Sequence, residues 1–337
     1  MPILLSHNSA LERLRAVPPQ VDWARRTQTP VSLADLDPTG RDIAKTDFAQ
    51  VGLLQSPVHY VVSSQERRTK RDAFKPHVCS LDTMPSGLLY DLGGGCFAAA
   101  PELTFIQMAQ QTSLMGAVVL GYELCGTYSH FPRFISGFYE RRALTTTLAI
   151  GNAIERLKGL RNLSPARDAL KWVHDGSASP METVVSCMLH FPATLGGFGL
   201  VSPSLNYEVP NDDAARTITG TKGCIIDNAY PDAKCGVEFD GREYHRDREK
   251  DRRRREALAH LGWTIYVLEV DDLTSYDAIE KKVALLDKVG RQPGAGPSRE
   301  KGAVLLERLL RATRFGVGMN DALFGVDVPK GRVKVHI

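Results

Sequence analysis

Acidic side chains around one short stretch of the chain are the residues best suited to chemistry. Asp227 follows an apolar run, and Glu238 and Asp240 lie two residues apart near the end of a second run, so the latter two project from one face of a strand. Neighbouring carboxylates repel one another and are costly to desolvate unless a cation lies between them. Mg²⁺, with Mn²⁺ as a substitute, prefers such oxygen ligands. The pattern predicts a divalent-metal site formed by these three side chains.

Two neighbouring strands are needed to bring these carboxylates together. The apolar runs 224–226 and 235–239 have strand character, and the turn residues 230–232 separate them, so we expect the two runs to pair. A structural alternative exists for the same residues. In that alternative Asp227 caps a turn before Asn228, and the other two acids are solvated strand ends.

The elements around this hairpin follow a mixed order. After Gly176 the patterns predict helix, three strands, helix, strand and helix. The expected ranges are 180–191, 206–209, 223–229, 233–240, 244–261, 264–270 and 275–289. This order predicts an αβββαβ core.

The core resembles the PD-(D/E)XK nuclease superfamily, and within it the branch similar to very-short-patch repair endonucleases. The shared pattern is D-x-A-x-P, then E-x-D-G-x-x-x-H, then D-x-x-R-x-x-x-L-x-x-x-G-W-x-V. It is met by Asp227, Ala229, Pro231, Glu238, Asp240, Gly241, His245, Asp251, Arg254, Leu258, Gly262 and Trp263, with Ile265 at the final aliphatic position. The resemblance covers about residues 179–273. It implies a restriction-endonuclease-like fold that hydrolyses DNA phosphodiester bonds with a divalent metal.

The resemblance also implies roles for individual residues. Asp227 and Glu238 would hold the metal with help from Asp240, and His245 would handle protons. Such a metal polarises the scissile phosphate and lowers the pKa of a bound water. The superfamily's lysine is missing, because Asp240 stands in its place, and Arg242 or Lys234 would be the cationic substitute. A histidine at a helix start is also a common structural residue.

Glu182 matches an acidic residue that the family often carries on the helix before the sheet. The same residue has a structural explanation. Ser179, Pro180 and Glu182 form a capping box, in which the serine is the N-cap, the proline is the first helical residue and the glutamate reaches back. Both roles stay open, since one helix end can be capped and also face the site.

The helix after the hairpin is dense in charge. We expect its arginines to contact DNA phosphates, which makes binding fall steeply with salt. Acids interleave with these arginines, so a solvated face with ion pairs is the alternative. Asp251 and Arg254 are expected to pair structurally or with the strand that bears the carboxylates. The candidate DNA contacts are Arg242, Arg246, Arg252 and Arg253.

The N-terminal half is predicted to be a separate region of mixed β and helical structure. Its segments 6–10, 58–62 and 97–109 are similar to the AbiEi-type antitoxin region. The resemblance adds a cognate toxin or a neighbouring-gene protein to DNA as an expected partner. The predicted class is α+β, with an N-terminal domain over 1–175, the nuclease-like domain over 176–290, and a linker, helix and tail over 291–337.

Composition sets broad limits on the chain. Its 337 residues, 43% apolar and 24% charged, suffice for two cores, and a net charge of +3 says little about nucleic acid. The chain has no apolar run of membrane-spanning length and no leader pattern, so we expect a cytoplasmic protein. Its six cysteines are scattered, which indicates neither a zinc site nor a disulfide framework.

Two functions from different classes follow. The first is a Mg²⁺-dependent DNA endonuclease in a prokaryotic defence, toxin–antitoxin or repair setting. The alternative is a catalytically degenerate nuclease fold that acts as a DNA-binding antitoxin or transcriptional autoregulator. The absent lysine favours the alternative, and the ordered acidic pattern favours the enzyme.

Overall fold

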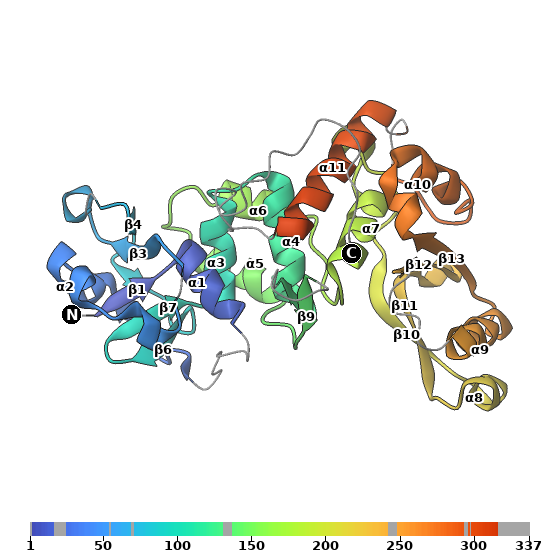
Figure 1. The fold of residues 1–337 in the computed structure, drawn as a ribbon, viewed down its shortest axis with the longest axis horizontal. Coiled ribbons are helices and arrows are strands. Elements are labelled where there is room, and N and C mark those ends of the chain that lie inside the picture. The colour runs from blue at the N-terminus through green and yellow to red at the C-terminus, as the bar shows by residue number, and fades with distance from the viewer. Residues whose placement is uncertain are drawn as a thin grey trace. The chain divides into compact units, whose positions relative to one another are not determined.

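The computed structural model divides the chain into two compact units of α+β structure (Figure 1). The first unit comprises Met1–Cys125 and Ala143–Val173, and the second comprises Gly126–Arg142 and His174–Gly316. The structure describes residues 2–16, 25–53, 55–68, 71–130, 137–241, 248–292, 296 and 298–315. Both units combine helices with β-sheets, which confirms the predicted α+β class.

The first unit is built on a five-stranded mixed sheet in the order β4-β3-β1-β7-β6. Its strands are β1 (Ile3–Leu5), β3 (Val58–Val62), β4 (Phe74–Val78), β6 (Leu89–Gly93) and β7 (Cys96–Ala99). The β1–β7 and β3–β4 pairs are parallel, and the β1–β3 and β6–β7 pairs are antiparallel. Every residue of β1 and β3 is buried, as expected for central strands whose sequences are nearly continuous apolar runs.

The helices of the first unit are α1 (His7–Leu14), α2 (Gly40–Lys45), α3 (Pro101–Ala109), α4 (Leu114–Cys125), α5 (Thr147–Arg156) and α6 (Ser164–Leu170). The apolar pattern from residue 101 to residue 124 is helical, but the structure has two helices there. The chain breaks between α3 and α4, where Ser113 accepts a hydrogen bond from the amide of Gly116 at 3.1 Å. Polar residues 110–113 favour this end and restart, because their side chains compete with the helical hydrogen bonds.

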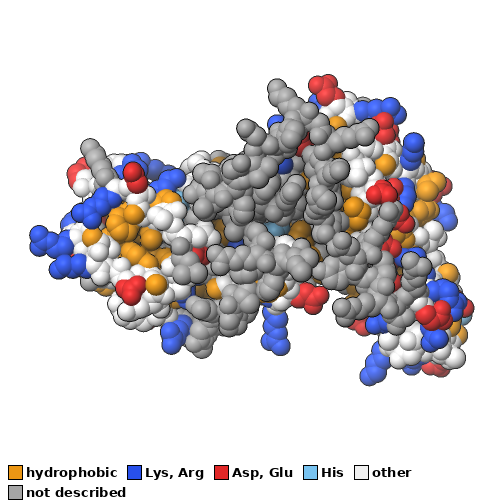
Figure 2. Space-filling view, viewed as in Figure 1, with side chains coloured by type: hydrophobic (Ala, Val, Ile, Leu, Met, Phe, Trp, Pro, Cys, Tyr) orange, Lys and Arg blue, Asp and Glu red, His pale blue; other side chains and the backbone are white. Residues whose placement is uncertain are grey.

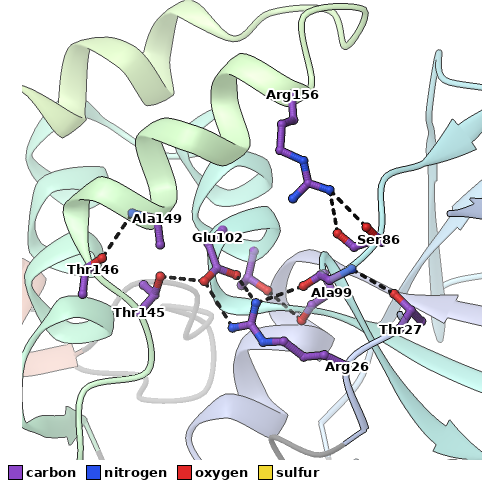
Figure 3. A network of polar contacts seen from close by, with 11 residues as sticks. Arg26, Thr27, Ser86, Ala99, Glu102, Thr145, Thr146, Ala149 and Arg156 are labelled. Atoms are coloured by element: carbon purple, nitrogen blue, oxygen red, sulfur yellow. Dashed lines mark hydrogen bonds and ion pairs between the residues drawn. The ribbon is translucent and has the colours of Figure 1, made fainter. Parts of the chain in front are cut away.

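An ion pair ties the segment after residue 24 to the first turn of α3 (Figure 3). The Arg26 guanidinium donates to both carboxylate oxygens of Glu102 at 3.0 and 3.1 Å, and Thr145 donates to the same carboxylate at 2.6 Å. Glu102 is buried. Since a buried carboxylate needs such partners, this network serves the packing of the unit.

The second unit contains a four-stranded sheet in the order β10-β11-β12-β13. The strands are β10 (Ser204–Pro210), β11 (Gly223–Tyr230), β12 (Cys235–Asp240) and β13 (Thr264–Glu269), and a separate hairpin joins β8 (Tyr128–His130) to β9 (Phe138–Glu140). The first two pairs in the order are antiparallel, and β12 pairs with β13 in parallel. The four predicted strands are therefore confirmed in order, with small shifts at their ends.

The helices of the second unit are α7 (Pro180–His190), α8 (Asp213–Thr219), α9 (Arg248–His260), α10 (Tyr276–Val283) and α11 (Arg299–Phe315). Helix α8 is not among the predicted elements. It packs on α9, and the apolar cluster beneath them includes Ala215, Ile226, Leu258 and Trp263. This packing fixes α9 against the strands that carry the candidate carboxylates.

Among the described residues, no helix combines the length and the apolar character needed to cross a membrane. All six cysteines lie within the described residues, where none of them is in a disulfide bond, and five of them are buried. This agrees with the expectation that the cysteines form no disulfide framework.

Candidate active site

A β-hairpin carries the predicted acidic residues. Strands β11 and β12 pair from Asn228 with Val237 to Tyr230 with Cys235, and a short 3₁₀ turn joins them. The two strands are neighbours, as expected, but they pair through residues 228–230 and 235–237, and the run 224–226 pairs with β10. Asp227 lies inside β11, because the strand continues beyond it to Tyr230.

The Asp227 carboxylate takes the place of a backbone acceptor beyond the end of this pairing. Its Oδ2 accepts a hydrogen bond from the backbone N–H of Phe239 at 2.9 Å. The side chain therefore has a fixed position opposite β12. The alternative in which Asp227 caps a turn before Asn228 is not what the structure shows, because the bond crosses to the neighbouring strand.

Glu238 already has a cation beside it. Its carboxylate is buried and receives both terminal nitrogens of Arg254 from α9, at 2.6 and 2.9 Å. Arg254 also donates to the carbonyl oxygen of Ile225 at 2.8 Å. This confirms the prediction that Arg254 pairs with the strand that bears the carboxylates. A planar guanidinium held at three acceptors is a well-oriented counter-ion.

Glu182 fulfils its predicted structural role at the start of α7. The Ser179 hydroxyl accepts a hydrogen bond from the Glu182 amide at 3.1 Å, and the Glu182 carboxylate accepts from the amide of Ala178 at 2.9 Å. The return contact lies one residue before the N-cap, a small departure from the usual capping box. Asn206 of β10 donates to the same carboxylate at 2.9 Å.

Glu182 also acts on the candidate site through its charge. Burial, and after it the charges of Glu182 and Glu238, raise the pKa of Asp227 to about 8, although the Phe239 N–H bond and Arg254 lower it. Burial likewise raises the pKa of Glu182. The structure therefore brings together Glu182, Asp227 and Glu238 from three separate elements, with Arg254 among them. A bound cation would strongly stabilise the ionised form of these carboxylates.

Asp240 lies beside a different arginine of α9. It is partly buried, and its Oδ2 is 3.8 Å from the nearest guanidinium nitrogen of Arg255 on α9. Three of the predicted site and DNA-contact residues, His245, Arg242 and Arg246, fall outside the described residues. Their predicted roles remain predictions.

The remaining predicted DNA contacts form ion pairs along α9. Arg252 donates to Glu249 at 2.8 Å and to Glu256 at 3.0 Å, and Arg253 donates to Glu249 at 3.0 Å. Figure 2 shows Lys or Arg and Asp or Glu side chains side by side at the lower right, where Figure 1 places α8 and α9. Phosphates would have to compete with these local acids for the two arginines.

The described side chains do not form a ready metal site. Within that part of the chain, no three His, Cys, Asp or Glu side chains are grouped so that they could hold a metal ion. Both Glu238 oxygens are engaged by Arg254, although carboxylate oxygens are the donors that Mg²⁺ prefers. Binding of a divalent cation at Asp227 and Glu238 therefore requires the guanidinium to withdraw.

Two residues of this site escape the sequence analysis. Asn206 positions Glu182 from 24 residues away, in a left-handed backbone conformation with φ 46°, and no local pattern indicates the contact. Asn228 is fully buried, and neither its Oδ1 nor its Nδ2 has a hydrogen-bond partner among the described residues. A polar residue directly after Asp227 in an apolar strand is a signal that could have identified it.

Comparisons with known proteins give little further information on this site. No family model and no solved structure matches the chain. Two uncharacterized proteins of Mycobacterium tuberculosis, from strains CDC 1551 / Oshkosh and ATCC 25618 / H37Rv, are each 28% identical to it over 127 residues. The match covers 37% of this chain and 42% of each relative, so the chain spans less than half the length of the curated relatives that it matches.

Proposed function

We propose that the second unit is a metal-dependent DNA endonuclease domain. The observation that carries the proposal is the group of carboxylates from α7, β11 and β12, whose burial and, after it, mutual repulsion raise the pKa of Asp227 to about 8. Acidic groups that destabilise one another in this way are more common at functional sites than in structural cores. Asp227 and Glu238 would hold Mg²⁺, with Asp240 and Glu182 assisting, and the ion would supply charge stabilisation at a phosphate.

One observation favours a second candidate function. Arg254 already neutralises Glu238 with two hydrogen bonds, and the superfamily's lysine is absent. A permanent ion pair at this position is compatible with a degenerate nuclease fold that binds DNA or a toxin partner without cutting. The two candidates differ in whether Arg254 yields its place to a divalent cation.

Calorimetric titration of Mg²⁺ into the full chain tests the first requirement without a guess at the substrate. We expect the wild type to bind the ion and Asp227→Ala to bind it at least about tenfold more weakly. Asp213→Ala, which removes a fully exposed carboxylate on α8, is the matched control and should bind as the wild type does. No heat of binding from the wild type would favour the binding module.

A stability measurement tests whether a divalent cation can replace the Arg254 guanidinium beside Glu238. Arg254→Met leaves Glu238 buried without a counter-ion and should lower the free energy of unfolding in EDTA by roughly 3–5 kcal/mol. Mg²⁺ should restore part of that loss if the carboxylates accept the ion. The double variant Arg254→Met, Glu238→Gln lacks the unpaired charge and should respond less. Absence of any Mg²⁺ effect on Arg254→Met would contradict the enzyme proposal.

DNA cleavage completes the test. Plasmid DNA should be nicked or cut in Mg²⁺ and remain intact in EDTA. An Asp227→Ala, Glu238→Ala double variant should lose the activity, and full activity from it would exclude this site. Salt-sensitive DNA binding that EDTA does not change, together with no cleavage, would select the binding module.

A further inference from the structure

Three histidines that are far apart in the sequence meet in the first unit. The rings of His7 and His77 stack with centroids 3.6 Å apart and planes inclined by 17°, and His59 lies 5.1 Å from His77. They come from the start of α1, from β3 and from β4, which the β1–β3 antiparallel and β3–β4 parallel pairings bring together. None of these side chains takes part in the proposed nuclease site.

A directed chain of hydrogen bonds fixes the protonation of these rings. The Gln111 side-chain N–H donates to His77 Nδ1 at 3.0 Å, so the proton of His77 is on Nε2 and is donated to His59 Nδ1 at 3.0 Å. Burial lowers the pKa of His77 to about 3 and that of His59 to about 4. Burial also lowers the pKa of His7 well below its usual value. The three rings are therefore neutral hydrogen-bonding groups at physiological pH.

The backbone at His7 is held in an unfavourable conformation. Its φ is 47°, in the left-handed region that residues with a Cβ rarely adopt. The Gln107 side-chain oxygen accepts a hydrogen bond from the His7 amide at 3.1 Å, and the Ser6 amide donates to the carbonyl of His59 at 3.0 Å. Strained residues held in this way tend to lie at ligand sites.

A cavity of about 270 Å³ opens beside this cluster. Its polar lining includes His7, His77, Gln107, Gln111 and Arg68, and Leu103 forms part of its apolar wall. Its described lining contains one guanidinium and no carboxylate. This volume is close to the lower end of the roughly 300–1,000 Å³ that small-molecule sites occupy, so the space suits a small ligand.

We propose that this cavity binds a nucleobase, with the phosphate of the same nucleotide near Arg68. A base is planar and uncharged, and its edge presents adjacent donors and acceptors that glutamine amides can bind in pairs. Imidazole rings and aliphatic side chains provide the stacking surface that bases use in protein sites. A lining without carboxylates disfavours hard cations such as Mg²⁺, which prefer oxygen ligands. The base has two sources with the same chemistry, a free mononucleotide or an unstacked base of a single strand.

The imidazole signals of the full chain in ¹H–¹⁵N NMR report directly on this cavity. We expect those of His77 and His59 to shift when a 5′-mononucleotide (AMP, GMP, CMP or UMP) or a mixed-sequence single-stranded DNA octamer is added. A stronger response to the octamer identifies a strand as the source, and a stronger response to a mononucleotide identifies the free ligand. Inorganic phosphate alone should leave these signals unchanged.

Two variants test separately how the base and the phosphate contribute to binding. Val78→Trp, at a lining position that is 41% exposed, should fill the mouth and abolish the shifts while the fold is kept. Arg68→Ala should weaken nucleotide binding about tenfold and leave nucleoside binding unchanged, since it removes one charged contact. Arg71→Ala, an exposed arginine three residues away that is not among the lining residues, is the matched control.

Three results would overturn the nucleobase assignment. The first is no response to any of these probes at millimolar concentration. The second is binding that Val78→Trp does not change. The third is an equal response to inorganic phosphate, which would show an anion site only. None of them affects the proposal for Asp227 and Glu238, because that site lies in other elements of the chain.

Discussion

Asp227 carries the most unfavourable charge in the candidate site, and this makes stability depend on pH. Its folded-state pKa is about 8, raised first by burial and then by Glu182, whereas an unfolded aspartate titrates near its usual value of 3.8. The folded protein therefore holds a proton that the unfolded chain releases. The resulting stability is fully present below about pH 4 and is lost as pH rises to about 8.

Asp227→Asn should remove this dependence, because the amide keeps an oxygen for the Phe239 N–H and carries no charge. In EDTA we expect the wild-type free energy of unfolding to fall with pH by at most about 1.4 kcal/mol per unit across this window. The variant should show a flatter profile and higher stability than the wild type at pH 8. Urea unfolding at pH 5, 6, 7 and 8 measures both. Parallel profiles would contradict the shifted pKa.

The sequence predicts which residue types form the site better than it predicts which residues they contact. The spacing of Glu238 and Asp240 indicates an acidic strand, but only the fold shows that Arg254 holds the first of them while Asp240 lies beside a different arginine. The cluster of His7 and His77 was not predicted as a site. Its formation depends on strand pairings between segments with no local signal for one another.

At the level of elements, the sequence predicts structures that depend on residues close together in the chain. It does not predict very short helices or contacts between distant segments. The hairpin 223–240 follows from two apolar runs and a proline-containing turn, all within a few residues. Helix α8 was missed because seven residues are too few for a periodic pattern to develop. Its start signal, Asp212 as an N-cap, is nevertheless in the sequence and accepts a hydrogen bond from Ala215 at 2.8 Å.

The N-cap of α7 matters because this helix brings Glu182 to the site. Ser179→Ala removes the acceptor of the Glu182 amide and should lower the free energy of unfolding by about 1 kcal/mol. Ser179→Thr keeps the hydroxyl and is the matched control, with a smaller loss. Chemical denaturation monitored by circular dichroism gives the difference. Equal stability of the alanine and threonine variants would show that the cap does not hold this helix end.

At the scale of the whole molecule, the sequence predicts a boundary after residue 175, and the structure separates the units at Val173 and His174. It also assigns Gly126–Arg142 to the second unit, which no local pattern indicates. That assignment depends on contacts between segments that are about 50 residues apart in the sequence. The Thr127 amide donates to the carbonyl of Ser177 at 2.8 Å, and the hydroxyls of Tyr128 and Thr183 are 2.9 Å apart.

The charge of the molecule determines how nucleic-acid binding should respond to salt. A net charge of +3 gives no general attraction to DNA, so contacts must come from local arginines such as Arg252 and Arg253, which already pair with Glu249. If they bind phosphates, each alanine variant should weaken duplex binding and reduce the slope of log K against log salt by about 1. Arg216→Ala on α8 is the matched control. Fluorescence anisotropy with a labelled duplex at several salt concentrations measures the slopes. Unchanged slopes for both arginines would assign this face of α9 to solvent and its own ion pairs, and DNA contact would then have to come from other cationic groups of the chain.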